Sequence, residues 1–253
     1  MKQGDDGASP VRQQHEQMLK LVAKGFFNEL TKYGVNHAEV LTVAGHLLDN
    51  VLQGAQQPGR NAELYNRLFT VKNVLDEWGS ARMLSTQQVS LVPLDMRWAS
   101  NLVQWLSEPA ARDSFYPPFP ESEVELREYL SAPARDYFCI LHDMVPVGII
   151  GAENIDARSG RLEMRKLVGS PAMHGKGIGK RATFLFLFHA FLIRKFHKVF
   201  LHSLDINIRN LNLNSRFGFA LEGVFFEEAV IQGRRHDVVR MSLTATVWEQ
   251  LFS

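Results

Sequence analysis

A glycine-rich loop between a strand-like segment and a long apolar helix constrains the fold of this chain more than any other feature. The strand-like segment covers Arg161–Val168, and the apolar helix is expected to run to about Ile193. Between them, His174–Gly179 carries a glycine at every second position. Glycines at this spacing let successive backbone N–H groups point the same way without a steric penalty from Cβ. Because a helix N-terminus adds partial positive charge, the junction predicts a binding site for a phosphate or pyrophosphate.

Two other kinds of phosphate-binding glycine loop fit this segment less well. A Walker loop needs Lys followed by Ser or Thr at the helix start, whereas Gly179 is followed by Lys180 and Arg181. A dinucleotide fingerprint opens a parallel βαβ unit, whereas this loop lies deep in a region of successive strands. A tight turn without any ligand is the remaining alternative.

The chain divides into two parts of different texture. Residues 1–85 are predicted to form a helical domain of three helices, the third from about Asn61 to Trp78, with no strand before Val89. Residues 86–253 are predicted to form a second domain in which strands and helices alternate loosely. Its strands are expected at 89–92, 136–141, 145–155, 161–168 and 199–204, and in a closing hairpin around Gly233. The fold class is therefore α/β, more closely α+β, with a mostly antiparallel sheet flanked by helices.

Local capping signals indicate where several helices begin. Asn36 and Glu39 form a capping-box pattern before the second N-terminal helix. Asp95 is placed to cap a helix that ends near Ser107. Further helices are expected over residues 121–130 and 207–217.

Composition excludes several classes of function. The net charge of +1 offers neither a basic surface for nucleic acid nor an acidic tail. Cys139 is the only cysteine and stands in an apolar run, so we expect it to pack in the core of a protein from a reducing compartment. The N-terminus lacks a signal-peptide pattern, and the apolar run at 182–193 is too short to span a bilayer. We therefore expect a cytoplasmic protein without a metal site and without a nucleic-acid or membrane partner.

Three motifs, in the right order, resemble the GNAT superfamily of N-acetyltransferases. The loop His174–Gly179 is similar to its pyrophosphate-binding motif, and segments 205–210 and 217–223 are similar to its Asn-led helix and Gly-Phe turn. Residues 233–243 resemble the closing hairpin of the branch that includes ribosomal-protein and spermidine acetyltransferases. The resemblance covers roughly residues 89–243 and leaves the helical N-terminus unexplained. It implies a GNAT-type fold and transfer of an acetyl or other short acyl group from acyl-CoA to a primary amine.

The resemblance also implies where the acyl-CoA binds. Backbone groups at the end of the strand are expected to bind the pantetheine arm and to polarise the thioester carbonyl. The glycine loop and the first helical turn are expected to bind the pyrophosphate, with Asn207 as a further contact or as a helix cap. The expected co-substrate contacts are Leu167, Val168, His174, Gly175, Lys176, Gly177, Ile178, Gly179, Lys180 and Asn207.

Two positions depart from the pattern of the family. His174 stands where Gln or Arg is usual, but that residue is expected to act mainly through its backbone. Asn214 stands where many members carry a tyrosine that protonates the departing thiolate. Asparagine cannot be a general acid at neutral pH, so a water, another residue or unaided departure of the thiolate remain open.

A base is needed because the ammonium form of an amine has no lone pair with which to attack. Glu163 matches an acidic position that is often assigned this role in the branch, and Glu153 and Asp156 are the alternatives. If Glu163 has no such role, we expect it to be a solvated strand residue paired with a neighbouring arginine. His236, in the closing hairpin, is the second candidate catalytic residue.

The amine acceptor is expected near the aromatic loop from Pro109 to Pro120, with Phe115, Tyr116 and Glu153 as substrate-binding residues. The main prediction is the amino group of a nucleotide-linked amino sugar used for surface polysaccharide synthesis; a protein N-terminus or a polyamine is the alternative. A non-catalytic CoA-sensing or protein-binding module is the alternative of another class. The N-terminal helices are expected to form an oligomer contact or one wall of the acceptor cleft.

Overall fold

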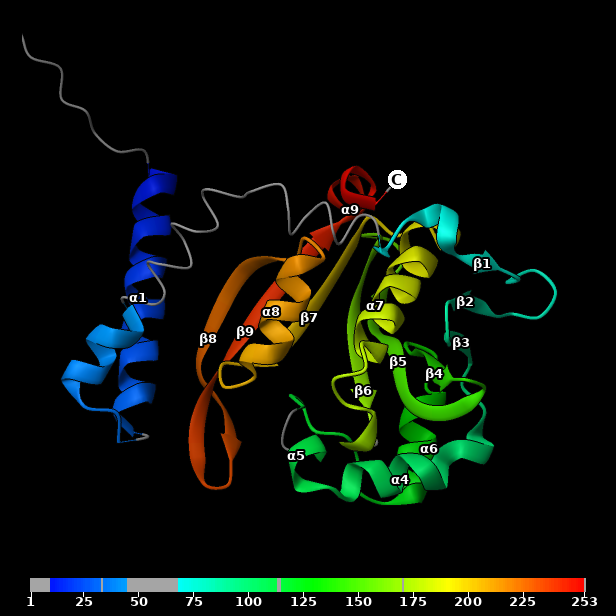
Figure 1. Cartoon of the computed structure of the whole chain (residues 1–253), viewed down its shortest axis with the longest axis horizontal. Coiled ribbons are helices and arrows are strands. Elements are labelled where there is room, and N and C mark those ends of the chain that lie inside the picture. Colours follow the sequence, from blue (N-terminus) through cyan, green and yellow to red (C-terminus); the bar gives the residue numbers. More distant parts are fainter. Residues whose placement is uncertain (1–9, 33, 45–67, 113–114, 170, 253) are drawn as a thin grey trace, which may run out of the picture. The chain divides into compact units, whose positions relative to one another are not determined.

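The chain forms two compact units, Met1–Asn61 and Ala62–Ser253, in a computed structural model that describes residues 10–32, 34–44, 68–112, 115–169 and 171–252 (Figure 1). In the first unit, α1 (Pro10–Lys32) is followed by helical residues 37–44. Asn36 Oδ1 accepts hydrogen bonds from the Ala38 and Glu39 N–H groups, and the Glu39 carboxylate accepts one from the Asn36 N–H. This capping box confirms the predicted start of the second helix.

A nine-stranded sheet organises the second unit, in the order β1-β2-β3-β4-β5-β6-β7-β9-β8. Neighbouring strands pair antiparallel except β6 and β7, which confirms the predicted mostly antiparallel sheet. The strands are β1 (Leu75–Asp76), β2 (Leu84–Thr86), β3 (Val89–Pro93), β4 (Asp136–His142), β5 (Val145–Asp156), β6 (Arg161–Val168), β7 (Lys198–Leu204), β8 (Ala220–Ile231) and β9 (Arg234–Thr244).

Helices cover both faces of this sheet. One face of β6 contributes Leu162 and Met164 to the main core, together with apolar residues of α7, α8 and α9. The other face contributes Leu167 to a second core cluster beneath α4 and α6. α7 and α8 lie side by side over the first face (Figure 1). The helices are α4 (Ala99–Ser107), α5 (Pro109–Arg112), α6 (Glu123–Ser131), α7 (Ile178–Phe188), α8 (Ile208–Arg216) and α9 (Ala245–Phe252).

The predicted third N-terminal helix is wrong over most of its described part. Residues 71–73 form one 3₁₀ turn, η1, and Leu75–Asp76 pairs with β2 as an edge strand. Three residues of the predicted helical stripe, Val71, Val74 and Trp78, pack against the sheet core instead, beside the buried Phe69. The predicted absence of strands before Val89 is therefore also wrong. The strands β1 and β2 were not recognised because they are too short to show an alternating pattern in the sequence. The expected domain boundary at residue 85 falls inside the second unit.

Most of the other predicted elements are confirmed. The strands β3 to β9 occur where they were expected, and Asp95 caps a 3₁₀ turn, η2 (Met96–Trp98), that leads into α4. Cys139 is fully buried in β4. The proline-rich loop contains a short helix, α5, that was not predicted. Among the helices of the described residues, none is both long enough and apolar enough to cross a membrane.

A buried histidine follows α7. The helix continues into a π-helical segment, η4 (His189–Ile193), which packs His189 against Trp78 and Phe138 with ring centroids 4.4 and 4.9 Å apart. Within the described part of the chain, His189 Nε2 has no hydrogen-bond partner. Burial lowers the pKa of His189 to about 4, because the imidazolium would be poorly solvated there.

We predict that His189 makes folding sensitive to acid. The unfolded chain binds a proton at this residue near pH 6.5 and the folded chain only near pH 4, so stability present above pH 6.5 is lost as the pH falls to 4. This shift corresponds to about 3 kcal/mol of unfolding free energy. Urea unfolding at pH 7 and pH 4 measures the loss, and His189→Phe should reduce it. An equal loss in both proteins would contradict the prediction.

Candidate active site

The sheet opens between its two parallel strands. β6 and β7 pair only where Arg161–Glu163 faces Lys198–Phe200, so the strands are unpaired beyond Glu163. A cavity of about 150 Å³ lies at this opening. Its walls come from both strands, the start of α7, α8 with its N-cap, and the aromatic loop. The lining residues are Phe115, Tyr116, Met164, Arg165, Lys166, Val168, Gly179, Leu201, His202, Asn207, Asn210 and Asn214.

Side chains from both faces of the sheet line this cavity. Along β6, Met164 and Lys166 lie on the face covered by α7 and α8, and Arg165 lies on the opposite face. Along β7, Leu201 belongs to the core beneath α7, so His202 points to the other face. The cavity therefore connects the two faces through the gap between the strands.

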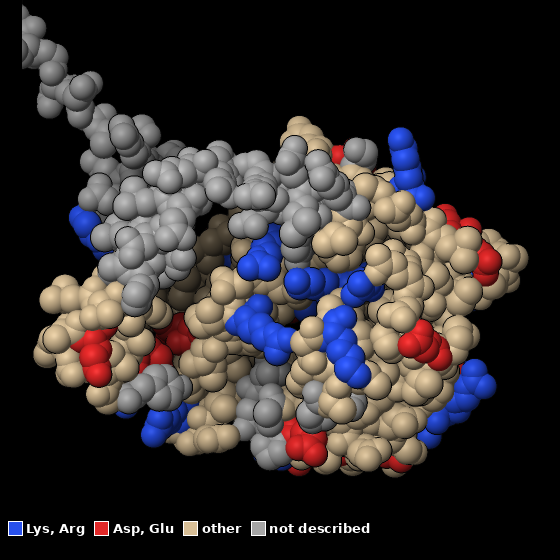
Figure 2. Space-filling model, viewed as in Figure 1, with Lys and Arg blue, Asp and Glu red and all other residues tan. Residues whose placement is uncertain are grey.

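The glycine loop lies at one side of the cavity, where its last residue, Gly179, forms part of the wall. Gly175 and Gly177 have φ values of +82° and +76°, a region that glycine enters without strain. Gly177 is the N-cap of α7 and makes no side-chain cap, so the first-turn N–H groups have no partner within the helix. A Cβ on Gly175 would meet nothing within 4 Å, so the space beside the loop is open. Lys and Arg side chains gather over α7 and α8 on the same face (Figure 2). These features fit a pyrophosphate group.

Two side chains hold the loop and its helix in place. Arg181 donates to Gln87 Oε1 from Nε at 2.8 Å and also from Nη2, and its Nη1 donates to the Lys176 carbonyl at 3.4 Å. These contacts join the start of α7 to the turn between β2 and β3. His174 Nε2 lies 2.8 Å from the Val168 carbonyl oxygen, so its side chain, and not only its backbone, holds the loop at the end of β6.

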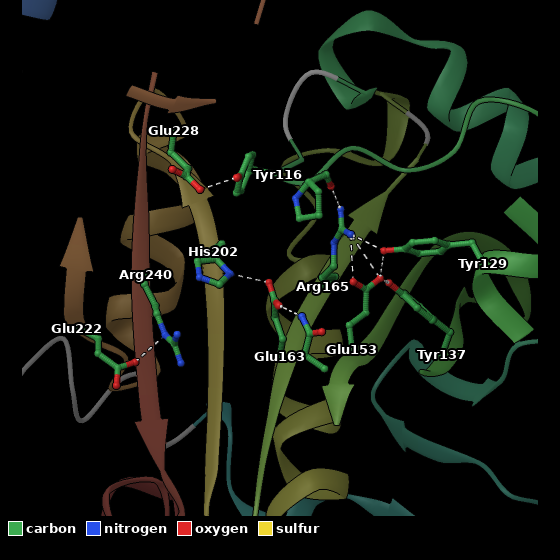
Figure 3. Close-up of polar contacts among 12 residues, drawn as sticks. Tyr116, Tyr129, Tyr137, Glu153, Glu163, Arg165, His202, Glu222, Glu228 and Arg240 are labelled. Carbon is green, nitrogen blue, oxygen red and sulfur yellow. Dashed lines mark hydrogen bonds and ion pairs between the residues drawn. The ribbon is translucent and has the colours of Figure 1, made fainter. Parts of the chain in front are cut away.

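Glu163 forms a pair with a histidine from the neighbouring strand (Figure 3). Its Oε1 lies 2.8 Å from His202 Nδ1, and its Oε2 accepts a hydrogen bond of 2.7 Å from Asn154. Burial alone would raise the pKa of Glu163, but the hydrogen bonds and charge from His202, with the Asn154 bond, lower it below its usual value. Glu163 is 2% exposed and is not among the cavity-lining residues, whereas His202 is. The expectation of a solvated carboxylate paired with arginine is therefore wrong, and His202 is the member of the pair that faces the cavity.

Arg165 is held beside the cavity by a buried cluster (Figure 3). Its Nη1 lies 3.2 Å from Glu153 Oε2, and both side chains are about 5% exposed. Glu153 Oε1 also accepts hydrogen bonds from Tyr129, at 2.6 Å, and from Tyr137. Burial raises the pKa of Tyr129 to about 12, so both phenols remain donors to this carboxylate. Glu153 is surrounded by these partners and positions Arg165.

Lys166 and Asn214 meet on the α8 side of the cavity. Lys166 Nζ donates to Asn214 Oδ1 at 2.8 Å and to Thr183 Oγ1 at 3.2 Å. Sequence reasoning noted Asn214 but missed Lys166. The sequence contained a signal for Lys166, because it occupies the next alternate position of β6 after Leu162 and Met164, which face the core.

The cavity brings together some of the predicted site residues and excludes others. Phe115, Tyr116, Val168, Gly179 and Asn207 line it, and Asn207 also caps α8 through a 3.3 Å bond to the Asn210 N–H. The structure places outside its lining the following predicted residues: Glu153, Asp156, Glu163, Leu167, His174, Gly175, Lys176, Gly177, Ile178, Lys180 and His236.

Two of the other acid–base candidates, His236 and Asp156, have structural partners away from the cavity. His236 Nδ1 lies 3.3 Å from Asp205 in a buried part of β9, and Asp156 pairs with Arg161 at 3.3 Å in the β5–β6 hairpin. The lining residues that sequence reasoning missed are Met164, Arg165, Lys166, Leu201, His202 and Asn210. In the part of the chain that the structure describes, no group of three or more His, Cys, Asp or Glu is arranged to hold a metal ion.

Comparison with known proteins agrees with this geometry. Residues 101–219 match the acetyltransferase (GNAT) family. The spermidine N(1)-acetyltransferase of Escherichia coli K12 is 25% identical over 171 residues, which cover 64% of this chain and 88% of the relative. The enzyme of the same name from Vibrio cholerae is 28% identical over 156 residues, 58% of this chain and 86% of the relative. A solved structure of the Vibrio cholerae spermidine N-acetyltransferase with CoA and spermine has a TM-score of 0.60 at 23% identity, covering 64% of this chain and 98% of that one.

The splayed mixed sheet, the glycine loop at the head of α7 and the cavity between the parallel strands define an N-acetyltransferase that uses acetyl-CoA as its co-substrate. More particularly, residues 101–219 belong to an acetyltransferase domain of the GNAT family.

We predict that Gly177→Glu weakens acetyl-CoA binding by more than about tenfold, because a carboxylate at this N-cap repels a pyrophosphate. Gly177→Asn is the matched control, since asparagine tolerates the left-handed conformation and carries no charge. Calorimetric titration of acetyl-CoA into the three proteins measures the effect. A Cβ at this position would lie 2.7 Å from Arg181 Nη1, so both variants must displace that side chain. Wild-type affinity in both variants would place the pyrophosphate elsewhere.

Proposed function

We propose that the acceptor of this N-acetyltransferase is a polyamine of the spermidine type. The observation that carries the proposal is a carboxylate at the aromatic edge of the cavity. Tyr116 lines the cavity and donates a 2.8 Å hydrogen bond to Glu228, an exposed residue of β8 (Figure 3). This hydrogen bond raises the pKa of Tyr116, so the phenol remains protonated. A flexible cation that places one amine in the cavity could pair a second amine with Glu228.

The names of the relatives support the same acceptor class. The two relatives described above are named spermidine N(1)-acetyltransferases, and each is matched over more than four fifths of its length. A polyamine therefore replaces the nucleotide-linked amino sugar as the main proposal. The amino-sugar nucleotide remains useful as a comparison acceptor, because Phe115 and Arg165 in the cavity wall offer a ring and a cation.

In the proposed reaction, His202 accepts a proton from the acceptor ammonium, and the free amine then attacks the thioester carbonyl. His202 lies on the sheet face that carries Tyr116, and Glu163 fixes its ring through Nδ1, which leaves Nε2 for the cavity. The carboxylate also stabilises the imidazolium that forms, in the way that a buried acid supports a catalytic histidine. Glu163 is thus proposed as the positioning partner of the base, and not as the base itself.

Location and assembly are further parts of the proposal. We propose a cytoplasmic protein, in keeping with the single, fully buried Cys139. We also propose an oligomer, since a solved structure of the Vibrio cholerae relative is a dodecamer.

The acceptor is tested by thiol release from acetyl-CoA with spermidine, with a nucleotide-linked amino sugar and with a peptide carrying a free N-terminus. Spermidine should give the highest kcat/KM. Preference for either other acceptor would overturn the polyamine proposal, and CoA binding without turnover of any amine would favour the CoA-sensing alternative.

We predict that Glu228→Gln raises the KM for spermidine about threefold to fivefold, as expected for one exposed ion pair. Steady-state kinetics with spermidine, compared with a simple monoamine, separates charge recognition from catalysis. Glu227→Gln is the matched control, because Glu227 is the adjacent exposed carboxylate of β8 and lies 3.9 Å from Arg235. Identical KM values for the two variants would show that Glu228 does not bind the acceptor.

We predict that His202→Gln lowers kcat by about 10²-fold or more, since it removes the proposed base. Glu163→Gln should lower kcat less, because a neutral amide can still orient the imidazole. Binding of acetyl-CoA, measured by calorimetry, should be unchanged in both. A larger loss in Glu163→Gln than in His202→Gln would make the carboxylate the base.

A further inference from the structure

A lysine occupies a position of β6 that otherwise faces the core. Lys166 follows Leu162 and Met164 on the face beneath α7 and α8, and it lines the cavity where β6 has lost its pairing with β7. An ammonium in such surroundings is costly unless it is paired with other charges or has a function. Its hydrogen-bond partners, Thr183 and Asn214, are both neutral.

The surroundings of Lys166 favour loss of its proton. Burial lowers the pKa of Lys166 to about 7, well below the 10.5 of a free lysine. The groups beside it are neutral: Thr183 from α7, Asn210 and Asn214 from α8, and Ile150, its neighbour on β5. The titratable or charged groups that share the cavity are Tyr116 and Arg165 from the acceptor side and His202 from β7. A group that titrates near neutrality can give up and regain a proton in each reaction cycle.

Lys166 and His202 lie on opposite faces of the sheet, at the same opening. His202 belongs to the face that carries the aromatic loop, whereas Lys166 belongs to the face that carries the glycine loop and α8. An acetyl-CoA whose pyrophosphate lies at Gly177 approaches from the second face. Its sulfur then arrives on the Lys166 side, and the acceptor amine on the His202 side.

Asn214 cannot itself supply a proton to the CoA thiolate on the Lys166 face. It is fully buried, and its amide donates to Asn210 while its Oδ1 accepts from Lys166. Asn214 thus holds the ammonium in place but has no proton to give to a thiolate.

We propose that Lys166 is the general acid that protonates the CoA thiolate. This inference rests on the acetyl transfer of the proposed function and not on the choice of a polyamine. The amine nitrogen forms a bond to the carbonyl carbon, the bond from carbon to sulfur breaks, and the sulfur keeps the electron pair. The Lys166 ammonium gives its proton to that sulfur and becomes a neutral amine. His202 holds the first proton from the acceptor, and the nitrogen loses its second proton to water as it becomes an amide. Afterwards His202 releases its proton to water, and Lys166 takes one up from water.

Lys166→Met tests the proposal, because it keeps an unbranched side chain one atom shorter and removes the ammonium. With acetyl-CoA, kcat should fall about 10²-fold, while the KM for acetyl-CoA stays within about twofold. The activity of the wild type should decline as pH rises through about 7, and the remaining activity of the variant should lack this decline. Lys198→Met is the control, since Lys198 lies on β7 outside the cavity lining and pairs with Glu222. An unchanged kcat in Lys166→Met would overturn the proposal.

Measurements of unfolding stability distinguish a catalytic role of Lys166 from a structural one. The folded chain binds a proton at Lys166 less readily than the unfolded chain does, so this lysine contributes least to stability below pH 7 and more as pH rises toward 10.5. Lys166→Met should therefore be at least as stable as the wild type at pH 7 in urea unfolding. A marked loss of stability, in proportion to the loss of activity, would indicate a structural role.

A rescue variant and an acceptor-free measurement complete the test. The double variant Lys166→Ala with Asn214→Tyr places a phenol where the lysine side chain has been removed. This variant should recover part of kcat, and its activity should decline only as the pH approaches about 10, where a phenol loses its proton. Ultraviolet absorbance of the CoA thiolate reports the ionisation of bound CoA without any amine. The thiol should ionise at lower pH in the wild type than in Lys166→Met. This shift would uphold the role of Lys166 even if spermidine is not acetylated, and its absence would overturn it.

Discussion

The parting of β6 and β7 is the constraint on which the rest of the second unit depends. Backbone groups that leave a ladder need other partners, and a strand pair that opens inside a sheet is stable only if its flanks are supported. Here β5 pairs with β6 and β9 with β7 along their lengths, so each half of the opening has a neighbour on its outer side. The opening can therefore persist as a cavity that connects two faces of the sheet with different side chains.

The charges at the opening are held by partners drawn from distant parts of the sheet. The buried pair of Arg165 and Glu153 is supported by two tyrosines, and the Arg165 guanidinium also lies 4.1 Å above the Phe119 ring. Buried ion pairs of this kind are poor sources of stability but tolerate little displacement. Their role here is to fix the side of β6 that faces the proposed acceptor, while the other side is left to Lys166.

The sequence predicts local features of this molecule well and distant pairs poorly. The glycine loop, the Asn36 capping box, the Asn207 cap and the hairpin strands depend on neighbouring residues, and all are present. The pairing of Glu163 with His202 depends on the register of two parallel strands, which no local pattern encodes. Lys166 could have been found from the alternation along β6, but its contact with Asn214 of α8 depends on a distant part of the chain. The prediction of a third N-terminal helix was wrong because short edge strands show too little periodicity to be distinguished from an apolar helical stripe.

The contact of Arg181 with Gln87 has a consequence for the edge of the sheet. It ties the helix that begins at the glycine loop to the turn of the β2–β3 hairpin, which lies near one end of the strand order. A ligand that binds only the folded loop stabilises whatever must be folded with it, by an amount that grows with the logarithm of ligand concentration. Acetyl-CoA bound at the loop, as expected from the resemblance, would thus protect the hairpin against local unfolding, and the supply of co-substrate would set how often this edge of the sheet unfolds.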